Sequence, residues 1–69
     1  MLTLTHHINE YLGAYWYTLT GTVQDSEGNT VNVVEGTPKL TTIKKTIKFY
    51  QGNGFYGAQV RHNVVLEKE

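Results

Sequence analysis

Between residues 15 and 23 the side chains alternate between two kinds. The odd positions carry Tyr, Tyr, Leu, Gly and Val, and the even positions from 16 to 22 carry Trp, Thr, Thr and Thr. Because successive side chains of a strand point to opposite faces of a sheet, this pattern predicts a strand whose odd face lies toward the core. Trp16 is then placed on the other face, away from Tyr15 and Tyr17, where a tryptophan is typical of a binding surface.

A turn and a second strand follow. The segment DSEGN, residues 25–29, combines Asp, Ser, Gly and Asn, which are turn-forming residues, and TVNVV after it returns to β-branched strand residues. Folding the chain about this turn pairs Val23 with Val31 and Gly21 with Val33. The apolar side chains of both strands then share one face, which supports a β-hairpin.

Residues 37–54 read better as a helix than as a strand. As a strand, Lys45 would share a face with Ile43 and Ile47. On a helical wheel the apolar residues instead fall within an arc of about 80°, with the lysines opposite. The apolar set is Leu40, Ile43, Ile47 and Tyr50, and the lysines are Lys44, Lys45 and Lys48. We expect Thr37 to cap the helix, Pro38 to begin it and Gly52 to end it.

Both ends of the chain alternate as well. After Phe55 the even positions are expected to face the core, and they are Tyr56, Ala58, Val60, His62, Val64 and Leu66. The opposite face carries Gln59, Arg61, Asn63 and Val65. These positions predict a C-terminal strand. The N-terminal LTLTHHI predicts either a further strand or an arm lying across the sheet.

The predicted architecture is one two-layer α+β domain spanning residues 1–69. It consists of a small antiparallel sheet, formed by the hairpin, the C-terminal strand and in one alternative an N-terminal strand, with one amphipathic helix, in the order (β)ββαβ. A single helix covers one face of such a sheet. The other face is therefore expected to be open.

Composition narrows the classes of function. The 69 residues contain no cysteine, and the formal net charge is zero. A small domain without disulfides is typical of the cytoplasm, and neither a secretion signal nor a membrane-spanning run is present, so we expect a soluble cytoplasmic protein. A neutral chain has no long-range field for nucleic acid, although its acids are concentrated before residue 36 and its basic residues after residue 38.

The motifs that could carry chemistry are weak. GNGFYG, residues 52–57, matches a dinucleotide-binding pattern, but it leaves a helix and enters a strand, which is the reverse of the required order. His6 and His7 diverge on a strand, so with His62 they do not form a metal site. We therefore expect no catalytic residues, no cofactor, no metal and no enzymatic activity.

The remaining function is binding to an unidentified protein, as a monomer or a weak homodimer. The expected contact residues are Trp16, Thr18, Thr20 and Arg61 on the open face, with Phe49 at the edge of the helix. One alternative is a weak single-stranded nucleic-acid binder that uses Trp16 and Arg61. In another, Trp16 packs under an N-terminal arm and Phe49 covers the sheet edge. In element order the chain resembles small phage-encoded inhibitors, including those that bind host RNA polymerase; the resemblance extends to architecture alone and implies an accessory or inhibitory role.

Overall fold

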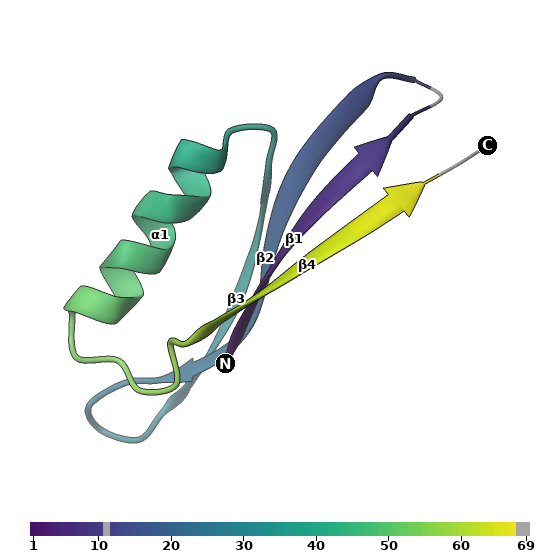
Figure 1. Ribbon diagram of the computed structural model, residues 1–69. Coiled ribbons are helices and arrows are strands. Elements are labelled where there is room, and N and C mark those ends of the chain that lie inside the picture. The colour runs from purple at the N-terminus through teal and green to yellow at the C-terminus, as the bar shows by residue number, and fades with distance from the viewer. Residues whose placement is uncertain (11, 68–69) are drawn as a thin grey trace.

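The computed structural model describes residues 1–10 and 12–67 of the chain. Its elements are β1 (Leu2–Asn9), β2 (Ala14–Gln24), β3 (Thr30–Thr37), α1 (Leu40–Gly52) and β4 (Val60–Glu67). The strands form one layer and α1 lies against one side of it (Figure 1). The predicted two-layer α+β architecture is confirmed, with the N-terminal segment present as a strand, in the order βββαβ.

The sheet has four strands in the order β3-β2-β1-β4. The hairpin of β2 and β3 has the predicted register, since Val23 pairs with Val31 and Gly21 pairs with Val33. Strand β1 pairs with β2 on one side and with β4 on the other. The N-terminal segment is therefore an inner strand, and the alternative of an arm lying across the sheet is wrong.

The sheet is mixed, not purely antiparallel. Strand β1 runs antiparallel to β2 but parallel to β4. The physical reason lies in the connection after β3, because α1 carries the chain back along the sheet before β4 begins. Strand β4 then runs in the same direction as β3, and a helix is the usual crossover between strands of the same direction.

The core lies between α1 and the near half of the sheet. Its most deeply buried side chains are Leu2, Leu19 and Ile43, each with no exposed surface, and Val23 with 2%. The predicted apolar face of the helix is correct, since Leu40, Ile47 and Tyr50 pack around the same cluster. The odd face of β2 and the even face of β1 meet here, as alternation requires.

The start of the helix differs from the prediction. Thr37 is the last residue of β3, and Lys39, in an extended conformation, occupies the cap position without a capping side chain. The Thr37 hydroxyl accepts a hydrogen bond from the backbone N–H of Lys39 at 3.1 Å, so it stabilises the turn into the helix and does not cap it. The helix ends at Gly52, as predicted, and the Asn53 side chain donates to the carbonyl of Phe49 at 2.7 Å.

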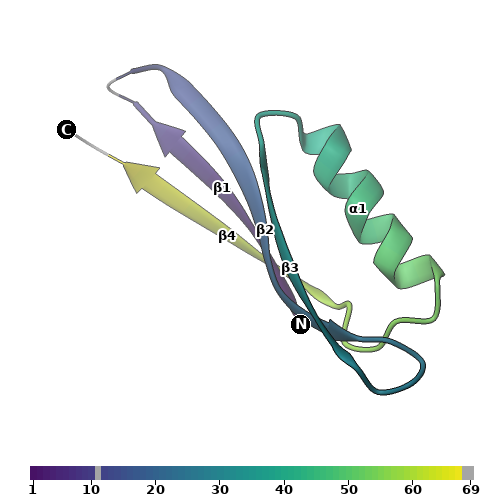
Figure 2. The same cartoon turned by 180° about the vertical axis from the view of Figure 1, so that it is seen from behind.

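The helix is much shorter than the sheet. Its 13 residues extend about 20 Å, whereas the 11 residues of β2 extend about 37 Å. The far ends of β1, β2 and β4 project beyond α1 (Figures 1 and 2). We call this part the distal end, and it comprises residues 6–9, 14–17 and 64–67.

At the distal end, several residues that were predicted to lie in the core are exposed. Tyr15, Val64 and Leu66 have the predicted helix-side orientation, but their exposed fractions are 56%, 63% and 48%. His62, next to the distal end on β4, is exposed too. Tyr56 is also exposed, at 65%, but for another reason: it lies at the opposite end of the sheet, before β4 begins, where it forms an isolated bridge with Gln24. Alternation predicts the orientation of Tyr15, Val64 and Leu66 correctly, but burial also requires a covering element, and α1 does not reach this far.

Candidate binding surface on the open sheet face

The side of the sheet opposite α1 carries four of the five residues that the sequence predicted for a binding surface. Trp16, Thr18 and Thr20 project from β2, and Arg61 projects from the edge strand β4. The pairing of Thr18 with Thr5, and of Thr3 with both Thr20 and Arg61, joins them across the sheet. Within the part of the chain that the structure describes, no element covers this face. We call it the open face (Figure 2).

Trp16 stacks on His7 of the neighbouring strand. The two residues are direct cross-strand partners, their ring centroids are 5.0 Å apart, and the planes are inclined by only 9°. The indole is accordingly half-buried rather than fully exposed. This contact results from the β1–β2 register, which brings an aromatic and an imidazole ring face to face.

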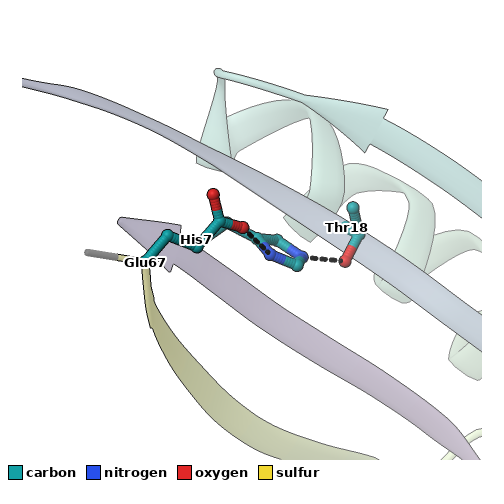
Figure 3. Close-up of polar contacts among 3 residues, drawn as sticks. All are labelled: His7, Thr18 and Glu67. Atoms are coloured by element: carbon teal, nitrogen blue, oxygen red, sulfur yellow. Dashed lines mark hydrogen bonds and ion pairs between the residues drawn. The ribbon is translucent and has the colours of Figure 1, made fainter. Parts of the chain in front are cut away.

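The His7 ring is held from a second direction by Thr18. Its Nε2 atom lies 2.9 Å from the Thr18 hydroxyl, a hydrogen bond between adjacent strands (Figure 3). On the other side, Nδ1 lies 3.7 Å from a carboxylate oxygen of Glu67 on β4. The Nδ1 atom is buried and makes no hydrogen bond within the described residues. The imidazole is thus fixed in position by the stack and by Thr18, with a carboxylate close enough to pair electrostatically when the ring is protonated.

A hydroxyl, an imidazole and a carboxylate in series are also the components of nucleophilic catalysis. The separation of 3.7 Å between His7 and Glu67 exceeds a hydrogen bond. The backbone N–H groups of His7 and Thr18 belong to the β1–β2 ladder, so they are not available to stabilise an oxyanion. The arrangement is better suited to orienting the His7 ring, and through it Trp16, than to a reaction.

The fifth predicted residue, Phe49, lies elsewhere. It is on α1, with an exposed fraction of 54%, and its ring contacts those of Tyr50 and Phe55 at centroid distances of 5.3 and 6.0 Å. Because α1 covers the other side of the sheet, Phe49 is not brought together with Trp16. The lysines of α1 are exposed on the same outer layer as Phe49, and so they are also remote from the open face.

A groove of about 370 Å³ lies on the helix side, where α1 no longer covers the sheet. Its lining is formed by Leu4, His6, Tyr17, Leu40, Lys44, His62, Asn63 and Val64. His6 stacks on Tyr17 with centroids 4.4 Å apart, and this pair resembles that of His7 and Trp16 on the opposite face. The sequence prediction assigned this region to the core. A comparison of helix length with strand length could have revealed the groove.

His7 and Glu67 are the residues of the open face that sequence reasoning missed. The sequence showed only that His6 and His7 diverge, and the structure agrees, since their rings lie on opposite sides of β1. The role of His7 depends on its pairing with Trp16, and the position of Glu67 depends on β4 lying beside β1. A strand register for β1 would have been the signal needed, but two alternating strands permit several registers.

Three further findings concern metal binding, membrane spanning and similarity to known proteins. Among the residues that the structure describes, no three His, Asp or Glu side chains converge as a metal site would require. The helix within the described ranges is also too short and too polar to cross a membrane. In comparisons with known proteins, no family model matches this chain, and no curated protein or solved structure is significantly similar to it.

Proposed function

We propose that this chain is a non-enzymatic protein-binding module whose contact surface is the open face of its sheet, with Trp16 as the anchor. The observation that carries the proposal is the stack of Trp16 on His7, with the imidazole held by Thr18. Tryptophan is the residue most enriched at the energetic centres of protein interfaces. An anchor that is already held in one orientation loses less conformational entropy on binding than a mobile one.

The surroundings of the anchor favour a protein as the partner. Threonine and asparagine side chains flank the Trp16–His7 pair, and they offer hydroxyl and amide groups together with methyl groups. Val34, with an exposed fraction of 83%, adds an apolar side chain on the β3 edge of the same face. An aromatic anchor surrounded by polar groups is the usual composition of a protein interface. A small module that binds in this way can inhibit its partner by occupying a surface, without any reaction.

A second candidate, single-stranded nucleic acid, is supported by one observation. Trp16 and Arg61 share the open face, so a base could stack and a phosphate could be neutralised on the same side. The lysines of α1, however, lie on the opposite layer. Because phosphate contacts supply most of the affinity in such complexes, this separation places the nucleic-acid function second.

The proposal is tested by affinity capture with mass spectrometry, using the wild type, Trp16→Ala and Tyr15→Ala. Tyr15 is the matched control, since it is an exposed aromatic residue adjacent in sequence but on the helix side. We expect Trp16→Ala to weaken capture of a specific partner by about 2 kcal/mol or more, and Tyr15→Ala to leave it unchanged. Proteins captured equally well by all three forms would contradict the proposed surface.

His7→Ala provides a second, graded test. Removing the imidazole leaves Trp16 present but unsupported, so we expect affinity to fall by less than it does in Trp16→Ala. A partner that binds His7→Ala more weakly than Trp16→Ala would show that the histidine, and not the tryptophan, makes the main contact.

A further inference from the structure

We infer that two copies of this chain pair through the outer edge of β4, antiparallel, with Val64 of each copy on the twofold axis. The two four-stranded sheets would then join into one continuous sheet. The inference does not rest on the proposed function: Arg61 belongs to both surfaces, but the anchor Trp16 lies on β2 and is not part of the contact. It rests on the backbone, the exposed apolar side chains and the charges of β4.

The backbone of β4 has a row of outward-facing groups. Leu2 donates its N–H to the carbonyl of Gln59 at 2.8 Å, and the parallel register repeats this pattern at every second residue. The peptide groups of odd-numbered residues therefore face β1, and those of His62, Val64 and Leu66 face outward. Strand β4 is at the edge of the sheet, so these groups are available to another strand.

The same even-numbered residues expose apolar side chains. Val64 and Leu66, at 63% and 48% exposure, lie side by side on the helix side of the edge. Native proteins usually protect an edge strand with charge, proline or a covering element. Neither Val64 nor Leu66 provides such protection. The helix α1 packs over β2 and β3, toward the opposite edge of the sheet, so it does not cover these two side chains.

One register makes the edge complementary to itself. With Val64 opposite Val64, Arg61 of each copy lies opposite Glu67 of the other on the open face. His62 then lies opposite Leu66 on the helix side, next to the groove that His62 lines. Arg61 and Glu67 would form a non-hydrogen-bonded pair, in which side chains approach most closely, and the symmetry creates this ion pair twice.

The neighbouring register with its axis at Asn63 lacks these ion pairs. Moving the axis to Asn63 places Arg61 opposite Val65 and Glu67 opposite Gln59, so neither charge meets its opposite. Opposite charges at directly facing positions stabilise a strand pair, so the two Arg61–Glu67 pairs favour the Val64 register over the Asn63 register.

The other edge of the sheet is less suited to this pairing. The helix-side residues of β3, Val31 and Val33, are already covered by the core, and Pro38 follows the strand directly. An interface through β4 alone is small compared with the about 1,200 Å² or more of stable complexes, so we expect a dimer that forms with rising concentration.

The first experiment measures the molar mass by sedimentation velocity from about 1 μM to about 1 mM, a range that brackets weak association. We expect the wild type to shift from monomer to dimer. Arg61→Glu, which places two pairs of like charges opposite one another, should weaken association about tenfold or more. Glu67→Arg should have the same effect, and the double variant Arg61→Glu/Glu67→Arg should restore association.

Matched controls separate the local contact from net charge. Lys48→Glu on the exposed side of α1 changes the net charge by the same amount as Arg61→Glu, and Glu27→Lys in the β2–β3 turn changes it as Glu67→Arg does. Both controls should dimerise like the wild type. The register would be overturned if either control failed to associate, or if the double variant did not regain association.

The second experiment requires no variant. Backbone amide hydrogen exchange of the wild type, followed by NMR at low and high concentration, should show new protection at His62, Val64 and Leu66 on dimerisation. The amides of Asn63 and Val65 should be protected at both concentrations, because they face β1. A wild type that stays monomeric throughout the series, or a dimer that leaves the even-numbered amides unprotected, would refute the inference.

Discussion

The α-carbon of Gly21 faces the backbone carbonyl oxygen of Met1 so closely that a Cβ atom at position 21 would overlap it. Gly21 also has a φ of 142°, which side chains of L-residues rarely adopt. It lies opposite Leu2 of β1 and Val33 of β3, so it is held between two strands. Space and backbone conformation both require glycine here.

We therefore expect Gly21→Ala to lower the free energy of unfolding by about 1–3 kcal/mol, the usual cost of a strained backbone position. Gly36→Ala on the neighbouring strand is the control, because its added Cβ would make only ordinary contacts, 3.8 Å from the Thr18 methyl group. Urea denaturation of the two variants measures the difference. Equal stability of both would show that β1 does not approach β2 at Met1 as described.

Ile43 connects the helix to the sheet. Its side chain has no exposed surface and packs in the cluster that includes Leu19 and Val33. Ile43→Ala should lower the free energy of unfolding by about 2–5 kcal/mol, whereas Lys48→Ala on the exposed side should change it by less than about 0.5 kcal/mol. Thermal unfolding followed by circular dichroism compares them. A small effect of Ile43→Ala would contradict the packing of α1 on the sheet.

Tyr17 and Trp16 separate stability from binding. Tyr17 is half-buried, packs against the core and stacks on His6 on the helix side, so Tyr17→Ala should destabilise the fold by about 2 kcal/mol or more. Trp16→Ala removes one ring from the open face, and we expect it to reduce stability by less than about 1.5 kcal/mol. The order of the two values in urea denaturation checks this, and the reverse order would assign Trp16 to the scaffold.

The β2–β3 turn contains a pH-sensitive carboxylate. The backbone N–H and then the side-chain amide of Asn29 donate to Asp25, at 2.9 and 3.1 Å, and these bonds hold the pKa of Asp25 below its usual value. A lowered pKa in the folded state means that the contribution to stability is present above about pH 4 and is lost as the pH falls through the lower value.

We expect an NMR titration of the carboxyl carbon of Asp25 to have its midpoint below that of an unstructured aspartate. Asp25→Ala should make unfolding less dependent on pH in the acid range, while Ser26→Ala in the same turn should not. An ordinary midpoint for Asp25 would show that the turn lacks these hydrogen bonds in solution.

The second candidate function gives a further expectation. Because the open face carries Arg61 but none of the α1 lysines, single-stranded DNA or RNA should bind no more tightly than the about 10⁻⁴ to 10⁻⁶ M of non-specific contacts at physiological salt. Fluorescence anisotropy with a labelled oligonucleotide across a salt series tests this. A tighter complex that weakens steeply with salt and disappears in Trp16→Ala would favour nucleic acid over protein as the ligand.

The predictions that succeeded from sequence are those that depend on neighbouring positions along the chain. Alternation placed Trp16 and Tyr17 on opposite faces, and the DSEGN turn determined that Val23 pairs with Val31. The apolar arc of α1 was correct for the same reason, since the helical period is a local property. The start of the helix was less predictable, because Thr37 can serve either a turn or a cap, and its place at the end of β3 decided between them.

The sequence by itself determined which side of the sheet each residue faces, because the pleat of a strand imposes that choice locally. Only the tertiary structure decided which strands are neighbours and which part of the sheet α1 covers. The insertion of β1 between β2 and β4 brings His7 against Trp16 and near Glu67. The limited length of α1 leaves Val64 and Leu66 exposed at the edge. Both outcomes depend on contacts between segments distant in the chain, and alternation within one segment carries no information about them.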